Sequence, residues 1–226
     1  MKISRVHRTL ALASLACAVG ACGALNTRAL ENAKQMQQKQ DYASLAAIKV
    51  DCEESSDGCN QLHLLKGDAC YRLAKQGQDA AKNYACAASE LATGIAQTKQ
   101  WQMEGFNLNR PQNYENLSES LRNGRDLATG AEADALNTRL LQASQDFSRA
   151  EPGNACAVYY QSNARYAQLR TCLLHPDKCP SVCQDLESIQ QQVTKASGAA
   201  QGSHCADGLQ QTTKDLAGAT RAVSCR

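Results

Sequence analysis

The chain has 226 residues, with 24 Lys and Arg against 22 Asp and Glu, and it is 43% hydrophobic but only 4% aromatic. This near-neutral balance, without a basic run beyond the first residues, argues against a nucleic-acid-binding protein. Twelve cysteines are many for a cytosolic protein, so the compartment decides how the sequence is interpreted.

The first residues have the features of an export signal. "MKISRVHR", residues 1–8, contains Lys2, Arg5 and Arg8 and no acid, and the next thirteen residues carry no charge. A basic head followed by an apolar run of roughly 7–15 residues is typical of a secretory signal and is too short to span a bilayer. Without residues 1–21 the net charge becomes −1, so the basic character belongs to the leader.

The end of this apolar run resembles a bacterial lipobox. "VGAC", Val19 to Cys22, has a branched apolar residue, two small residues and then cysteine, whereas the competing "SLAC" has Ser14 at the apolar position. The resemblance implies a signal peptide over 1–21, lipidation (palmitate) at Cys22 and a tether over 22–27. Gly23, the residue directly after this cysteine, favours sorting of the lipoprotein to the periplasmic side of the outer membrane. A conventionally cleaved signal and a retained signal anchor are the alternatives.

Helical periodicity runs through nearly all of the remaining chain, and strand-like alternation is absent. Turn signals such as "KQGQD", "EPGN" and "HPDKCP" separate the periodic segments. These features predict an all-α fold of antiparallel helical hairpins. The predicted helices cover 28–38, 41–50, 60–75, 79–98, 112–127, 131–149, 154–174, 182–197 and 205–224.

Part of this region resembles the tetratricopeptide repeat. One segment has matching residues at Leu64, Gly67, Tyr71, Ala80, Tyr84 and Ala87, and a second has them at Leu127, Gly130, Ala131, Ala143, Phe147 and Ala150. "DYASLAA", residues 41–47, resembles the start of another second helix. The first glycine is one place early, and Asp134 replaces an aromatic residue. The resemblance implies stacked helix pairs over 28–150, with an irregular hairpin array as the alternative, followed by a cysteine-rich three-helix unit over 151–226.

Ten cysteines follow Cys22, and in an oxidising compartment an even number predicts disulfides. The turn near residue 77 places Cys70 opposite Cys86, and Cys52 with Cys59 would close an acidic loop. Cys156 cannot reach Cys172 along a straight helix of about 24 Å. We therefore predict Cys156–Cys205, and in the remaining group Cys172–Cys183 and Cys179–Cys225, with other pairings open in that group.

Metal and catalytic signatures are weak. His175, Cys179 and Cys183 lack the close cysteine pairs of structural zinc sites, and "DCEESSDGCN" lacks the ligand pattern of a calcium loop. We therefore expect no metal or cofactor. "SES", residues 118–120, is similar to the Glu–Ser pair of helical peptidoglycan lyases, but the aromatic context is missing. Glu119 is accordingly interpreted as a solvent-facing helix residue.

Aromatic residues provide the candidate binding positions. Trp101, Met103 and Phe106 lie in a polar stretch between helical blocks, where they either anchor a partner or fill the junction. Another set, Tyr159, Tyr160 and Tyr166, either lines a concave face or packs at the edge of the core.

Together these features predict a non-enzymatic, lipid-anchored protein of the bacterial envelope that binds a protein partner through a helical surface. An accessory or assembly factor of an envelope machine, such as a secretion system, fits this description. We expect membrane contact through the acyl anchor and no nucleic acid. The alternatives are a peptidoglycan-active helical enzyme using Glu119 and a small-ligand or metal-binding periplasmic protein.

Overall fold

The computed structural model describes residues 28–51, 56–103, 106–200 and 202–225. The predicted signal peptide, the lipobox with Cys22, and Cys52 lie outside these residues. Within the described segments, none of the helices combines the length and the apolar character needed to cross a membrane.

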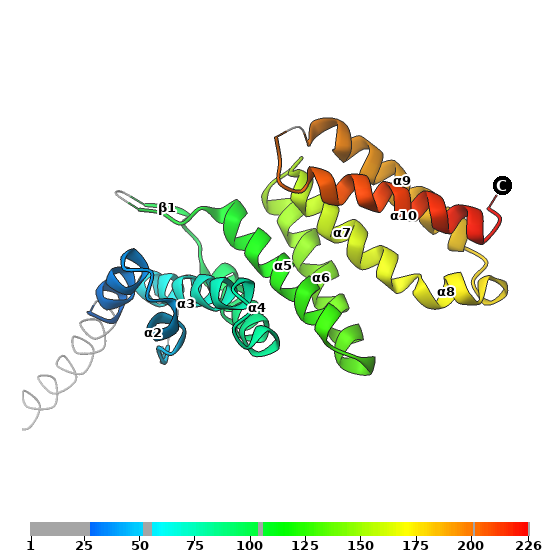
Figure 1. The fold of residues 1–226 in the computed structure, drawn as a ribbon. Coiled ribbons are helices and arrows are strands. Elements are labelled where there is room, and N and C mark those ends of the chain that lie inside the picture. Colours follow the sequence, from blue (N-terminus) through cyan, green and yellow to red (C-terminus); the bar gives the residue numbers. More distant parts are fainter. Residues whose placement is uncertain (1–27, 52–55, 104–105, 201, 226) are drawn as a thin grey trace, which may run out of the picture.

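The predicted all-α fold of antiparallel hairpins is confirmed, and the helices lie in a row along the molecule (Figure 1). Residues 28–38 form the first described helix. The further helices are α2 (Tyr42–Ala46), α3 (Asp57–Lys75), α4 (Ala80–Gln97), α5 (Arg110–Leu127), α6 (Gly130–Ala150), α7 (Ala155–Gln168), α8 (Arg170–Leu174), the 3-10 helix η1 (Pro176–Lys178), α9 (Val182–Ala199) and α10 (Ala206–Ala222).

Two differences from the predicted elements are local. The helix expected over 41–50 is only the five residues of α2. Between α4 and α5 the chain forms a hairpin of two-residue strands, β1 (Gln102–Met103) and β2 (Phe106–Asn107), which are too short to produce an alternating pattern.

Local sequence explains where several helices begin. The Ser56 hydroxyl accepts a hydrogen bond from the Cys59 amide at the start of α3. The Asn154 side chain accepts bonds from the amides of Cys156 and Ala157 at the start of α7. Each cap satisfies amides that have no partner within the helix, so the helix starts at a defined residue.

Helices α3 and α4 approach closely because a glycine on each meets a leucine on the other. A Cβ atom on Gly67 would lie 2.6 Å from Leu91 Cγ and 3.0 Å from the Leu91 backbone nitrogen. A Cβ atom on Gly94 would lie 2.7 Å from Leu64 Cδ2. This pair is the helix–turn–helix that the first repeat-like segment predicts.

Replacing Gly67 with alanine should therefore destabilise the protein, although alanine is the better helix former. The added methyl group meets backbone that cannot rotate away, and overpacking of this kind costs about 1–3 kcal/mol. Gly218→Ala in α10 is the matched control, because no atom lies within 4 Å of its added Cβ. Urea unfolding should show a loss for Gly67→Ala and a small gain for Gly218→Ala; equal effects would contradict the close packing.

The second repeat-like segment does not contain a helix pair. Gly130 and Ala143 would belong to two different helices of a repeat, but both lie on α6, which runs without a turn from Gly130 to Ala150. Helix α6 instead pairs with α5, and the turn between them falls at Ala128 and Thr129.

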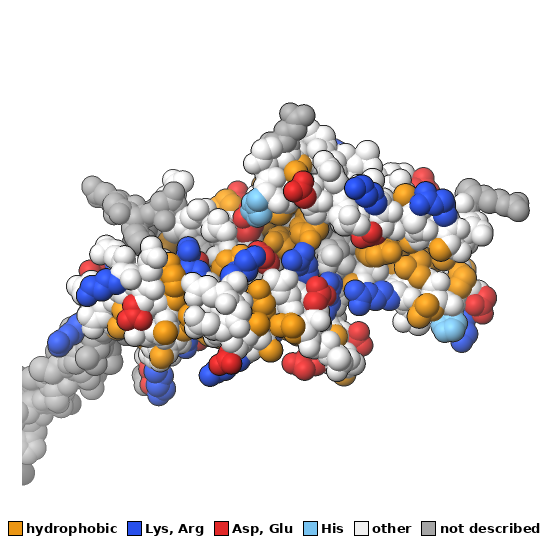
Figure 2. Space-filling view, in the orientation of Figure 1, with side chains coloured by type: hydrophobic (Ala, Val, Ile, Leu, Met, Phe, Trp, Pro, Cys, Tyr) orange, Lys and Arg blue, Asp and Glu red, His pale blue; other side chains and the backbone are white. Residues whose placement is uncertain are grey.

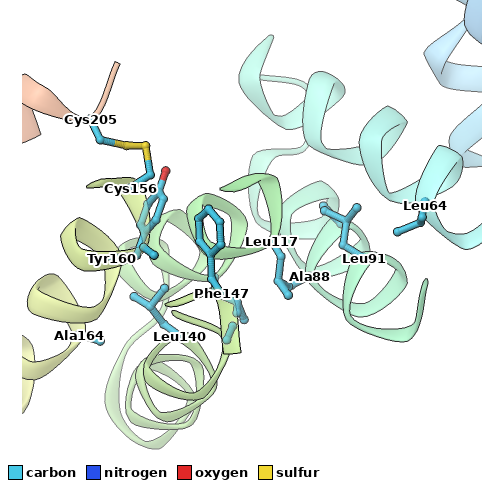
Figure 3. Close-up of a cluster of buried hydrophobic side chains, with 14 of the residues drawn as sticks. Leu64, Ala88, Leu91, Leu117, Leu140, Phe147, Cys156, Tyr160, Ala164 and Cys205 are labelled. Carbon is cyan, nitrogen blue, oxygen red and sulfur yellow. A yellow bond between two sulfur atoms is a disulfide. The ribbon is translucent and has the colours of Figure 1, made fainter. Parts of the chain in front are cut away.

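The apolar core of the described residues is divided into clusters, two of which share α7, while another, around Leu45 and Leu62, lies between residues 28–38, α2 and α3. A central cluster around Phe147 joins α3 to α7 and includes Leu91, Leu117, Leu140 and Tyr160 (Figure 3). A second cluster lies between α9 and α10 and includes Leu186, Ile189 and Leu216. Val158 of α7 packs against the second cluster while Tyr160 belongs to the central one, so α7 links the hairpin region to the C-terminal helices.

Two predicted disulfides are confirmed: Cys70–Cys86 joins α3 to α4, and Cys156–Cys205 joins α7 to the segment before α10 (Figure 3). Cys59 is also disulfide-bonded. The prediction that Cys52 is its partner lies outside the described residues.

The predicted pairs Cys172–Cys183 and Cys179–Cys225 are wrong. The bonds are Cys172–Cys179 and Cys183–Cys225, each with Cα atoms 5.5 Å apart. The helix predicted over 154–174 breaks at Leu169, and η1 then turns the chain so that Cys179 returns to Cys172 on α8. Cys183 lies in the first turn of α9, and because α9 and α10 are antiparallel it meets Cys225 just after α10 ends.

Candidate functional site

The candidate site is a cleft on the face formed by α3, α5 and α7, where α5 contacts both of the other helices. Its volume is about 510 Å³, and His204 and Gly208 close the end next to α10. In Figure 2 hydrophobic side chains gather between α5 and α10 near the middle of the visible face, with charged side chains of both signs around them. Below, "central cleft" refers to this recess and its lining residues Tyr71, Lys75, Glu115, Glu119, Arg122, Tyr159, Tyr160 and His204.

Glu119 lies inside the central cleft, so its interpretation as a solvent-facing residue is wrong. Its side chain is only 15% exposed. Tyr71 donates a hydrogen bond to Oε2 and Lys75 donates one to Oε1, both at 2.6 Å. Burial alone would raise the pKa of Glu119, but these two hydrogen bonds and the positive charges of Lys75 and Arg122 together outweigh it and hold the pKa below its ordinary value. Glu119 is therefore an ionised, fully engaged carboxylate at neutral pH.

Glu115 lies one helical turn before Glu119 and has a different environment. Its side chain is 13% exposed, and among the described residues its polar contact is with His204, whose Nε2 lies 3.5 Å from Oε2. Burial raises the pKa of Glu115, His204 opposes the increase, and the negative charge of Glu119 adds to it. Two carboxylates on one face of α5 thus have pKa values shifted in opposite directions.

The tyrosines of α3 and α7 form the apolar part of the wall. Burial raises the pKa values of Tyr71 and Tyr160, so both stay neutral hydroxyls. Arg122 donates a hydrogen bond to the Tyr159 hydroxyl, and its guanidinium carbon lies 5.7 Å from the centre of the Tyr159 ring. The ring lies against Gly208, where a Cβ atom would be 2.7 Å from Tyr159 Cε2.

The structure separates the aromatic candidates from one another. Tyr159 and Tyr160 both line the central cleft, although Tyr160 is only 3% exposed and belongs mainly to the core. Tyr166 packs against the second cluster instead. Trp101 stacks on Tyr114 at 6.4 Å between ring centroids, as expected for a residue that fills the junction. The side chains of Met103 and Phe106 lie outside the description, and their binding role stays a prediction.

Sequence reasoning missed Glu115, His204, Lys75 and Arg122. A signal for two of them was present, because Glu115, Glu119 and Arg122 follow the spacing of one helical face. The rest of the site could not be found in this way, since Tyr71 and Glu119 are 48 residues apart and meet only through the packing of α3 on α5.

Potential metal ligands occur beside this cleft but are already bonded to each other. Sulfur and imidazole atoms of Cys156, His204 and Cys205 lie within 4.8 Å of one another. The two sulfurs form a disulfide, and a disulfide offers no thiolate to a metal ion. Cys179 and Cys183 of the H-x3-C-x3-C pattern likewise belong to two different disulfides.

Replacing Glu115 or Glu119 with the neutral residue glutamine should change the stability of the protein in opposite directions. The raised pKa of Glu115 means that its ionised form opposes folding above the ordinary carboxyl range. Glu115→Gln should therefore increase the free energy of unfolding at pH 7, by less than about 1 kcal/mol after solvent screening. The lowered pKa of Glu119 contributes stability at neutral pH that is lost as the pH falls. Glu119→Gln should consequently lower stability at pH 7 by about 1–3 kcal/mol.

Urea unfolding of both variants at pH 7 and pH 4 checks this pair. For both variants, the difference in unfolding free energy from the unsubstituted protein should be smaller at pH 4. At that pH, protonation of the glutamates in the unsubstituted protein reduces the same negative charge that the substitutions eliminate. A change of the same sign for both variants at pH 7 would contradict the opposite shifts.

Comparison of the chain with protein-family models, curated proteins and solved structures finds no match in any of the three, so its function is inferred from the residues of the central cleft.

Proposed function

We propose that the chain is a non-enzymatic, lipid-anchored envelope protein that docks a protein partner through the central cleft. The leader and the lipobox-like "VGAC" support export and acylation at Cys22. An acyl anchor restricts the search for a partner to a membrane surface, and a row of helix pairs offers it an extended face. The role is that of an interaction scaffold or assembly factor for an envelope machine at the outer membrane, such as a secretion system.

The observation that carries this proposal is the composition of the central cleft. Tyrosines from two helices and an arginine from a third converge at a recess that is open to solvent. Tyrosine and arginine are enriched at the points that dominate binding energy in protein interfaces. Disulfides fix α3 to α4 and α7 to the segment before α10, so little conformational freedom is lost when a partner binds.

The state of Glu119 favours binding over peptidoglycan cleavage. A general acid has to carry a proton at the working pH. Glu119 already accepts hydrogen bonds from Lys75 and Tyr71, and they lower its pKa. The alternative function as a peptidoglycan-active enzyme therefore has the wrong protonation state at its candidate residue.

A photo-crosslinking amino acid placed at Gln112 tests the docking role. Gln112 is exposed at the rim of the central cleft, and Gln191 on α9 is an equally exposed control position. In cells we expect one discrete protein adduct from position 112 and none from position 191. Equal adducts at both positions, or none at 112, would contradict docking at the cleft. Peptidoglycan turnover that depends on Glu119, tested with Glu119→Gln, would favour the enzyme instead.

The anchor is tested separately. Cys22→Ala should abolish palmitate incorporation and move the protein from the membrane fraction to the soluble periplasmic fraction, because the acyl chains are the inferred attachment. Palmitate labelling and fractionation measure this directly, with Cys17→Ala as the matched control. Labelling that survives Cys22→Ala and is lost in Cys17→Ala would move the processing site to the competing "SLAC".

A further inference from the structure

The charged groups of the central cleft are unevenly paired: two carboxylates, Glu115 and Glu119, share it with two cations, Lys75 and Arg122. The Glu119 carboxylate is neutralised by Lys75 and hydrogen-bonded by Tyr71. Arg122 is engaged by the Tyr159 hydroxyl and by Asn123 Oδ1, 2.9 Å from Nη2. The basic group next to Glu115 is His204, whose Nε2 lies 3.5 Å from Oε2. Among the described residues, Glu115 is thus the carboxylate in the cleft that has no lysine or arginine within ion-pair distance.

The surroundings of Glu115 fit the rest of a basic side chain. The cleft extends to Tyr159 and Tyr160, whose rings lie 5.0 Å apart and are tilted by 53°. Tyrosine faces attract ammonium and guanidinium groups, and they also cover the apolar stem of a lysine or arginine. A volume of about 510 Å³ accommodates one long side chain together with a short stretch of backbone, but not a helix.

From this arrangement we infer that the central cleft binds a lysine or arginine side chain of the partner polypeptide, with its cationic group on the Glu115 carboxylate and its stem against Tyr159. The inference rests on the proposed docking function and specifies the chemistry that the partner presents. The partner's cation replaces water at a buried carboxylate, so the charge that costs stability in the free protein contributes to affinity in the complex.

The groups facing Glu115 determine how binding responds to pH. They are Lys75 and Tyr71 from α3, Glu119 and Arg122 from α5, Tyr159 and Tyr160 from α7, and His204 before α10. The lowered pKa of Glu119 keeps its carboxylate ionised between pH 7 and pH 5, and burial keeps the Tyr71 and Tyr160 hydroxyls neutral. Because burial raises the pKa of Glu115, lowering the pH favours its protonation, and a neutral carboxyl no longer attracts a cation. Affinity should therefore fall as the pH is lowered from 7 to 5.

Titration of the acyl-free Cys22→Ala protein with matched probes tests the inference. The probe is a blocked pentapeptide, Ala-Ala-Arg-Ala-Ala, compared with the same peptide carrying citrulline, which keeps the shape of arginine without its charge. Binding followed by NMR should favour arginine at least tenfold, with shifts at Glu115, Tyr159 and His204. Glu115→Gln should reduce arginine binding at least tenfold. Glu187→Gln, which removes an exposed carboxylate from α9, should leave it unchanged.

Folding does not confound the Glu115→Gln result, since this variant is expected to be the more stable one. Equal binding of arginine and citrulline peptides, or unchanged binding in Glu115→Gln, would overturn the inference. Agmatine binding more than tenfold tighter than the pentapeptide would overturn it in favour of a small-amine site. If position 112 crosslinks to a partner but the cleft does not prefer the arginine peptide, the docking function is supported and only the inferred basic side chain of the partner is refuted. If the arginine peptide binds but position 112 gives no crosslink in cells, the proposed docking function is refuted.

Discussion

Replacing Cys156 and Cys205 together with alanine is expected to lower the free energy of unfolding by about 4 kcal/mol. The bond joins positions 49 residues apart, so it removes many conformations from the unfolded chain. Both cysteines are buried, at 2% and 3% exposure, and their side chains pack in the central cluster. Urea unfolding of the oxidised double variant measures the loss.

The matched control is the double variant Cys172→Ala with Cys179→Ala. This bond spans only 7 residues and should be worth about 2.5 kcal/mol by the same reasoning. The Cys156→Ala, Cys205→Ala variant should also bind the arginine peptide more weakly, because Cys205 holds the neighbouring His204 at the central cleft. The control variant should bind it unchanged. A larger loss in the control than in Cys156→Ala with Cys205→Ala would refute the assignment of loop closure as the main effect.

Phe147→Ala should cost about 3–5 kcal/mol, the usual range for removing a fully buried aromatic side chain. Phe147 is 0% exposed and lies in the middle of the cluster that joins α3 to α7 (Figure 3). Tyr114 stacks on it with ring centroids 5.3 Å apart, and Trp101 stacks on Tyr114 in turn. The substitution therefore leaves a cavity and also removes the support of the β1–β2 junction.

Thermal and urea unfolding measure this loss, and tryptophan fluorescence reports on the junction because Trp101 is the single tryptophan. Leu174→Ala is the control, since that leucine is 77% exposed and its replacement should change stability by less than about 0.5 kcal/mol. If Phe147→Ala cost no more than Leu174→Ala, the central cluster would not be the main source of stability.

The positions of the helices were predictable because they follow from local patterns. The turn around Gly153 and Asn154 combines a residue with positive φ and a helix cap, and both signals are present in "EPGN". The break at Leu169 has no such signal. No Pro or Gly lies within residues 160–174, so periodicity alone predicts a continuous helix there. That break changes where Cys172 lies, and the two wrong disulfide pairs follow from it.

The candidate site was less predictable than the fold. The spacing along α5 places Glu115 and Glu119 on one face, but it does not show which partners α3 and α7 supply. Glu119 has hydrogen bonds from residues 44 and 48 positions earlier, and these decide both its burial and its charge. A sequence pattern reports which residues share a helix face; the face they meet depends on tertiary packing.

The position of α7 between two clusters has a consequence for how the molecule opens. Tyr160 packs on the hairpin side and Val158 packs on the C-terminal side, so neither side can detach without exposing apolar surface of the same helix. Native-state hydrogen exchange should consequently find the α7 amides among the slowest in the protein, opening only in whole-molecule unfolding. The protein should then unfold as one cooperative unit. Cleavage of the chain after residue 150 would divide a shared core and would not release two independently folded domains.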